Sequence, residues 1–301
     1  MPYSFHSHSG QFCHHGHGLL EDVVKEAIRK KFRVYGLTEH MPRYAESELY
    51  PEEIEANCTP ETLKQAFEDF YVEAKRLRDL YKDQISLLIG VEIEYIHHDY
   101  CNYVARLKDK VDYVVGSLHH VNTVPIDFSP ELYQKALTEV NGNLVDLFVR
   151  YFDEQWAMLQ AVQPQVVGHF DLIRIFADPS LADQVLLTPT VWERIVRNVD
   201  FIIGYGGLFE INSRSWKKKL TDAYPQRDII KLIKQKGGKF TLSDDCHGPK
   251  DVGLFYEKIP QYLIENGIDT VYYLSKEGKD IVVKEHKDVV KDEFWNHLSN
   301  W

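Results

Sequence analysis

The feature that most constrains the fold is the alternation of short apolar runs with longer amphipathic stretches. Apolar residues at helical spacing predict helices over residues 20–31, 61–82, 144–162, 188–199 and 226–236. Buried strands are predicted over residues 2–5, 33–37, 85–93, 111–117, 165–169, 207–211, 239–243 and 270–274. Such alternation produces parallel strands joined by right-handed helical crossovers.

With seven or eight such units, closing the sheet into a barrel is more economical than leaving it open, because closure removes both edges. We therefore expect an α/β barrel, as a single domain over residues 1–301, since no linker rich in Pro, Gly or Ser interrupts the pattern. A doubly wound open sheet is the alternative. Neither a G-x-G-x-x-G nor a G-x-x-x-x-G-K-[ST] loop follows a predicted strand, so nucleotide-binding loops of those types are absent.

The charge balance limits the partners. The chain carries 46 acidic and 35 basic side chains, a formal net charge of −11. An acidic surface disfavours nucleic acid and anionic membranes, and favours cations or small molecules as partners. The longest uncharged apolar run, residues 201–209, is far shorter than the roughly 18 residues of a membrane span. We expect no membrane partner.

Cysteine usage indicates the compartment. The chain has no C-x-x-C pair, so a zinc ribbon is excluded and a disulfide-rich secreted scaffold is disfavoured. The N-terminal residues show no basic start followed by an apolar stretch. A reducing, cytoplasmic location is expected. The four cysteines are Cys13, Cys58, Cys101 and Cys246.

Residues of metal-ligand type follow nearly every predicted strand. In a parallel barrel the carboxyl ends of all strands open on one face, so these side chains should converge although they span 240 positions. They are His6, His8, His40, Glu92, His119, His169, Asp245 and His247, joined by one of His14, His15 or His17. The N-terminal histidines are interleaved with other residues, unlike a purification tag.

Imidazole and carboxylate groups are ligands suited to zinc, manganese or iron. The spacing of His6 and His8 suits one ion, because alternate residues of a strand point the same way. Nine candidates exceed the needs of a single ion. We therefore predict two or three divalent ions, with Glu92 bridging a pair.

The ordered motifs HxH, CxHG, GLTEH, GVE, GSLHH, GHFD and DxH, over about residues 5–250, resemble the polymerase-and-histidinol-phosphatase (PHP) superfamily. The histidinol-phosphate phosphatase branch is the most similar, notably at residues 36–40 and 115–122. The resemblance implies a distorted seven-stranded (β/α) barrel, TIM-like in outline, and a trinuclear metal centre. It also implies hydrolysis of L-histidinol phosphate, a step of histidine biosynthesis.

The same resemblance implies the distribution of ligands. The first ion would take His6, His8, Glu92 and Asp245; the second would share Glu92 and add His119 and His169; the third would take His15, His40 and His247. His15 is preferred to His14 by the C-x-H-G pattern, His119 to His120 by its place after Gly-Ser-x, and Asp245 to Asp244 by the D-x-H spacing.

General metal chemistry then gives a mechanism. Two ions lower the pKa of a bridging water, and the resulting hydroxide attacks phosphorus in line. Glu92, Asp245 and His247 are the catalytic candidates, and a metal-bound water or Asp245 could protonate the leaving oxygen. No base partner marks Cys13 or Cys246 as a nucleophile, so both are expected to pack.

Substrate binding should use arginine, whose planar fork matches phosphate oxygens. Arg174 and Arg214 follow predicted strand ends closely enough to reach the mouth of the barrel, and Arg43 is a third candidate. Glu210 and Asn212 could read the amino or imidazole group of the substrate. Lys217–Lys219 are expected to form a solvated loop.

Three alternatives stay open: a PHP-type phosphodiesterase or exonuclease, a deaminase of the amidohydrolase type, and a non-catalytic metal-binding module. The acidic balance disfavours the first, and the GSLHH motif stands where the second would place a metal-bridging lysine. Arginines near the mouth disfavour the third. The sequence leaves open the metal identity, the oligomeric state and the role of residues 122–143, for which a lid is one option.

Overall fold

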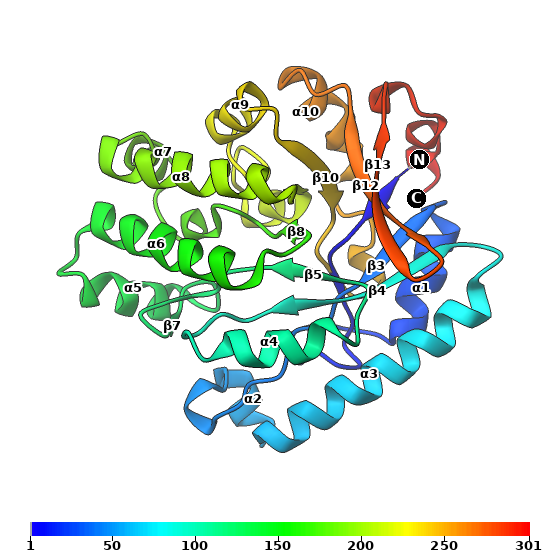
Figure 1. Ribbon diagram of the computed structural model, residues 1–301, viewed down its shortest axis with the longest axis horizontal. Helices are drawn as coiled ribbons and strands as arrows, with labels where there is room; N and C mark the ends of the chain where they lie inside the picture. Colours follow the sequence, from blue (N-terminus) through cyan, green and yellow to red (C-terminus); the bar gives the residue numbers. More distant parts are fainter. Residues whose placement is uncertain (1) are drawn as a thin grey trace.

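The computed structural model describes residues 2–301 and is built around seven parallel strands (Figure 1). Neighbouring strands pair in the order β1-β3-β4-β5-β8-β9-β10. Their bounds are β1 Tyr3–Ser4, β3 Val34–Leu37, β4 Ser86–Ile93, β5 Tyr113–Gly116, β8 Val166–Val167, β9 Leu208–Asn212 and β10 Lys239–Ser243. Every neighbouring pair in this order is parallel. This confirms the predicted parallel architecture.

A short strand pair closes the ring. β2 (Ser7–His8) continues the chain after β1, and β11 (Cys246–His247) continues it after β10. The two pair in parallel, with Ser7 opposite Cys246 and His8 opposite His247. The first and last strands therefore meet only at their carboxyl ends, which gives the distorted, nearly closed barrel that was predicted.

Helices surround the sheet on its outer side (Figure 1). They are α1 Leu20–Arg29, α2 Pro51–Glu55, α3 Pro60–Tyr81, α4 Tyr100–Lys108, α5 Pro130–Glu139, α6 Leu144–Val162, α7 Pro179–Leu186, α8 Pro189–Tyr205, α9 Arg227–Gln235 and α10 Ile259–Glu265. Within residues 2–301, none of them is both long enough and apolar enough to cross a membrane.

The longest helix, α3, illustrates why the chain forms these elements. The Thr59 side chain accepts a hydrogen bond from the Thr62 backbone N–H at the amino end, and Pro60 occupies the first turn. One face of the helix is buried along Leu63, Phe67, Phe70, Ala74 and Leu77. The predicted helix over 61–82 is shifted by only one residue at each end.

Side chains fill the interior of the barrel. Tyr113 of β5 is buried, and its hydroxyl donates to the Phe5 carbonyl at 2.8 Å. Gly36 of β3 allows this, since a Cβ there would lie 1.8 Å from the Tyr113 hydroxyl.

One predicted strand lies outside the ring, and one region that the sequence left open is now described. The strand predicted over 270–274 is β12 (Val271–Glu277), but it pairs antiparallel with β13 (Asp280–His286) as a hairpin outside the ring. The prediction missed β13, although Gly278 with φ 64° supplies the turn. Residues 122–143 contain α5 and β7 (Val124–Pro125), which pairs with β6 (His120–Val121).

Candidate metal centre

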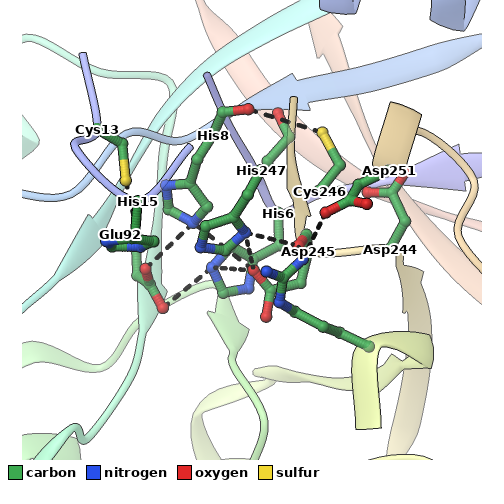
Figure 2. Close-up of polar contacts among 12 residues, drawn as sticks. His6, His8, Cys13, His15, Glu92, Asp244, Asp245, Cys246, His247 and Asp251 are labelled. Atoms are coloured by element: carbon green, nitrogen blue, oxygen red, sulfur yellow. Dashed lines mark hydrogen bonds and ion pairs between the residues drawn. The ribbon is translucent and has the colours of Figure 1, made fainter. Parts of the chain in front are cut away.

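The predicted ligands gather at the carboxyl ends of the strands, around a cavity of about 420 Å³. Seven of the nine line it: His15, His40, Glu92, His119, His169, Asp245 and His247. The other two, His6 and His8, are fully buried beside them. Figure 2 shows side chains from β2, β4 and β11 converging on one region.

Glu92, at the end of β4, lies at the centre of this cluster. Its carboxylate oxygens lie 2.9–3.3 Å from ring nitrogens of five histidines, which are His6, His8, His40, His119 and His169. Burial alone would raise the pKa of this carboxyl, but the imidazoles, His6 foremost, lower it well below its usual range. Glu92 is therefore ionised and available to bridge cations.

Asp245 faces the first two histidines. Its Oδ1 lies 3.7 Å from Nε2 of both His6 and His8, and one ligand atom from each of the three residues lies within 4.8 Å of the others. The φ angle of Asp245 is 46°, a left-handed conformation that is uncommon for a residue other than glycine. Asn212 Nδ2 donates to Asp245 Oδ2 at 3.1 Å and helps fix its direction.

Three further groups have ligand atoms within 4.8 Å of one another. Two share a residue with the first group: one is His6, Glu92 and His169, and the other is His8, His40 and Glu92. The third is Cys13, His15, His40 and His247. Cys13 was not predicted as a ligand. Burial raises the pKa of its thiol, but the adjacent His15 more than offsets this and the result is a pKa of about 6.

The donor atoms fit divalent cations. Among the described residues, both ring nitrogens of His8 and of His40, and one oxygen of Glu92, are buried without a hydrogen-bond partner. Such orphaned groups cost free energy in a protein interior, and a cation would supply the missing partner. Imidazole and carboxylate are the ligands that zinc, manganese and iron accept.

In two of the three ambiguous pairs, the residue not chosen is engaged outside the cluster. His14 Nε2 lies 3.0 Å from Cys58 Sγ, whereas His15 belongs to a ligand group. Asp244 accepts hydrogen bonds from Ser4, Tyr35 and the backbone of Gly253, and burial raises its pKa to about 6.

The third pair is His119 and His120. His119 Nε2 lies 3.0 Å from Glu92, and its Nδ1 lies 2.8 Å from Asp127. His120 lies 3.8 Å from Glu94, and burial lowers its pKa to about 4. His119 is therefore the member of the pair that reaches Glu92.

The structure places the three candidate arginines differently. Arg214 lines the cavity, and its Nη1 donates to the Asp245 carbonyl at 2.9 Å. Arg43 also lines the cavity, but it is buried and pairs with Glu53 and Glu94 at 3.0 Å each. Arg174 is not among the lining residues; it is buried and donates to Asp171 at 2.8 Å.

Glu210 and Asn212 do not line the cavity, unlike the prediction that they read the substrate. Glu210 Oε2 instead lies 2.9 Å from His6 Nδ1, on the opposite side of the ring from Glu92. A carboxylate behind a ligating histidine fixes its tautomer and orientation. Glu210 thus contacts His6 and Asn212 contacts Asp245, because β9 runs beside β10.

Sequence reasoning missed residues that support or line the site. Asp127 and Glu52 contact the Nδ1 atoms of His119 and His15, at 2.8 and 2.6 Å. They lie outside strand ends, so no positional signal marked them. Lys218 lines the cavity, although residues 217–219 were expected to be a solvated loop. The sequence could have indicated Lys218 by its position four residues after Arg214, since both residues lie in the 3₁₀ turn Ser213–Lys218.

Comparison with known proteins places the chain among its relatives. The PHP domain model matches residues 4–214. A Schizosaccharomyces pombe protein named "Probable histidinol-phosphatase" is 45% identical over 98% of this chain and 96% of its own length. The Saccharomyces cerevisiae histidinol-phosphatase is 32% identical over 98% of this chain and 100% of its own length.

A solved structure shares the fold. The Lactococcus lactis histidinol phosphate phosphatase, in complex with zinc, L-histidinol and phosphate, superposes with a TM-score of 0.63 at 18% identity. The match covers 93% of this chain and 98% of that one. The matched domain model, the two full-length relatives and the shared barrel confirm the resemblance seen in the motifs. The chain belongs to the PHP-domain family, in its histidinol-phosphatase branch.

Proposed function

We propose that this chain is a metal-dependent phosphomonoesterase that hydrolyses L-histidinol phosphate to L-histidinol and phosphate. The observation that carries the proposal is the convergence of nine imidazole and carboxylate side chains on one cavity that Arg214 also lines. The names of the relatives and the L-histidinol and phosphate bound in the Lactococcus lactis structure support the same substrate.

We infer three divalent ions, with zinc the first choice because the Lactococcus lactis structure holds zinc. Manganese and iron accept the same ligands. When bound, such ions act as Lewis acids, generate a nucleophile from water near neutral pH and offset the charge that develops on phosphate. We assign the ligand sets as the resemblance implies them: His6, His8, Glu92 and Asp245; Glu92, His119 and His169; and His15, His40 and His247. His119 is included through its contact of 3.0 Å with Glu92.

Two cationic side chains suit the phosphate group. Arg214 lines the cavity with 18% of its side chain exposed, and its Nη1 also pairs with Asp251 at 3.0 Å. Its bond to the Asp245 carbonyl fixes it next to a ligand, so phosphate held there would lie beside the metal centre. Lys218 lines the same cavity and adds a second positive charge.

The pKa shifts of Asp245 and His247 indicate which group is suited to protonate the leaving oxygen. Burial would raise the pKa of Asp245, yet His6 and Arg214 lower it below its usual value. Asp245 is thus held as a carboxylate and is a poor acid. Burial and Arg214 lower the pKa of His247, which keeps its imidazole neutral and able to ligate. Water in the cavity is the better proton donor for the leaving oxygen.

Part of the cavity wall suits the organic part of the substrate. L-Histidinol carries an ammonium group and an imidazole ring. Glu52 and Asp127 offer negative charge to the ammonium group, and Phe128, 38% exposed, offers an aromatic face to the ring. The partner that this wall fits is therefore a small cationic phosphomonoester.

The free thiols of the chain bear on the cellular compartment of the protein. All four cysteines are free, two of them buried. We infer a reducing compartment, because a free thiol beside the metal centre survives best there.

The test is phosphate release from a panel of substrates by metal-loaded protein. Histidinol phosphate should exceed p-nitrophenyl phosphate and a nucleotide diester by orders of magnitude. Equal or greater release from the diester would replace this proposal with a phosphodiesterase.

The Arg214→Gln variant tests the phosphate subsite. Loss of one charge-assisted hydrogen bond, worth about 1.5–3 kcal/mol, should lower kcat/KM for histidinol phosphate about 10- to 150-fold. Arg197→Gln is the matched control, since Arg197 pairs with Asp153 on α6, away from the cavity. An unchanged kcat/KM in Arg214→Gln would remove this residue from the subsite.

A further inference from the structure

Cys13 lies in the loop between β2 and α1, and the backbone holds it at the metal centre. Its N–H donates to the Ser9 carbonyl at 3.0 Å, and its carbonyl accepts from the Gly16 N–H at 3.0 Å. A Cβ on Gly16 would lie 2.9 Å from the backbone of Ser9 and Gly10, so the turn needs glycine. The His17 N–H donates to the His247 carbonyl at 2.8 Å, which ties this loop to β11.

Three imidazoles surround the thiol. Cys13 Sγ lies 3.2 Å from His15 Nε2 (Figure 2), and ligand atoms of His15, His40 and His247 lie within 4.8 Å of it and of one another. The ring centroids are 5.3 Å apart for His15 and His40, and 4.8 Å apart for His15 and His247. Four donor atoms at this spacing match a tetrahedral zinc site.

In His15 and His247, Nδ1 is already hydrogen-bonded, which leaves Nε2 for an ion. His15 Nδ1 lies 2.6 Å from Glu52. His247 Nδ1 lies 3.0 Å from the Asp245 carbonyl, whereas both ring nitrogens of His40 lack a hydrogen-bond partner among the described residues and are free to ligate. Partners behind the ring are what metal-ligating histidines have in proteins.

The other cysteines lack this arrangement. Cys246 is fully buried, but its thiol contacts the Tyr35 hydroxyl at 3.2 Å and the His8 carbonyl at 3.7 Å. In Figure 2 it lies on the side of the cluster away from Cys13. Cys58 contacts a single imidazole, that of His14. Of the four thiols, only Cys13 belongs to a group of ligand atoms among the described residues.

We propose that the Cys13 thiolate is the fourth protein ligand of the ion held by His15, His40 and His247. On binding, the thiol releases its proton to solvent and the sulfur donates an electron pair to the ion. The inference rests on the proposed metal centre and revises the packing role expected for Cys13 from sequence.

The consequence is that the ions would have different roles. Sites with four protein ligands are closed, whereas catalytic sites keep a position open for water or substrate. An ion held by Cys13, His15, His40 and His247 would therefore pin the loop before α1 to β11, and activation of water would fall to ions held by the residues around Glu92. A thiolate also favours zinc over manganese at this position.

The test is the absorption spectrum of the protein loaded with Co²⁺ alone, with the ions counted by elemental analysis. A cobalt–thiolate bond gives a charge-transfer band in the near ultraviolet, whereas nitrogen and oxygen ligands do not. The wild type should show the band, and Cys13→Ser should lack it. Cys58→Ser, which removes a thiol that also contacts a histidine, should keep it.

A fully loaded wild type without the band would overturn the inference, as would a band that persists in Cys13→Ser. X-ray absorption of the wild type loaded with zinc covers the case in which Cys13→Ser fails to fold. A sulfur neighbour at about 2.3 Å is expected, and nitrogen and oxygen neighbours alone, at about 2.0–2.2 Å, would contradict it. Neither readout depends on turnover, so loss of histidinol phosphate activity with the band intact would count against the proposed function alone.

Discussion

The buried carboxylate of Glu92 is the negative charge that most of the site histidines contact. Glu92 contacts five imidazoles and is buried to 1% exposure, so its charge is compensated only by those rings and by any cation they hold. Removing a charge of this kind leaves its partners uncompensated, which is far costlier than losing a surface ion pair.

Replacing Glu92 by Gln keeps the shape of the side chain and removes the bridge. The ion content should fall, and histidinol phosphate turnover should fall by more than about 100-fold, because even residues behind metal ligands contribute about 10- to 100-fold. Elemental analysis, turnover and circular dichroism measure the three effects. The control is Glu257→Gln, at an exposed position. A variant with full ion content and full turnover would rule out the bridging role.

At the residue scale, the sequence predicted the gathering of histidines and carboxylates at the mouth better than it predicted which cationic side chains line the cavity. His169 and Asp245 could be found because every strand end of a parallel barrel faces the same mouth. The role of Arg43 could not be predicted from the sequence, because Arg43 pairs with Glu53 and Glu94, which belong to other elements. Lys218 was missed for a related reason, since a run of three lysines looks like a solvated loop until its turn is placed.

The elements themselves derive their stability from one buried face each. In α3, Leu77 is fully buried and Leu80 is 54% exposed, although the two are separated by less than one turn. Leu77→Ala should lower the free energy of unfolding by about 2–5 kcal/mol, because it leaves a cavity. Leu80→Ala, the same substitution on the same helix, should change it by less than about 0.5 kcal/mol. Chemical denaturation measures both, and equal effects would contradict the packing described for α3.

The contact between α1 and α3 should make the free energy of unfolding depend on pH. Glu21 of α1 has its pKa lowered from 4.5 to about 2, because Lys25, Arg76 and Tyr81 hydrogen-bond to it. The unfolded chain binds this proton near pH 4.5 and the folded chain only near pH 2, so the contribution is complete above pH 4.5 and is lost as the pH falls towards 2.

The comparison of wild type with Glu21→Gln measures this contribution. Above about pH 5 the wild type should be more stable by about 0.5 kcal/mol, the size expected of an exposed ion pair, and the difference should shrink below pH 4.5. A difference that grows on acidification would show the opposite linkage.

At the scale of elements, periodicity predicted α1, α3, α6, α8 and α9, because each has one buried face. Helices α2, α4, α5 and α7 were not predicted. Helix α6 starts and ends at the predicted residues 144 and 162. Helix α8 was predicted to end at 199 but continues to Tyr205, where Gly206 with φ 84° ends it. β13 could not be predicted from alternation, since its hairpin with β12 lies outside the ring and β13 has no fully buried face.

At the scale of the whole molecule, the closure of the barrel and the candidate metal centre depend on the same strand pair. The ring closes where β2 meets β11, and this pairing places His8 directly opposite His247. Ser4 and Asp244 reinforce the same seam with a hydrogen bond of 2.6 Å. Cations at the mouth would therefore join the first and last strands of the barrel, so metal binding and the integrity of the fold are coupled.

The most direct test of this account is the turnover of histidinol phosphate by protein stripped of its ions and then refilled in steps. The account predicts turnover near zero in the stripped, folded protein. It also predicts recovery that follows the ions bound, with a total above one per chain. Full turnover by the stripped protein, or saturation at a single ion, would contradict it.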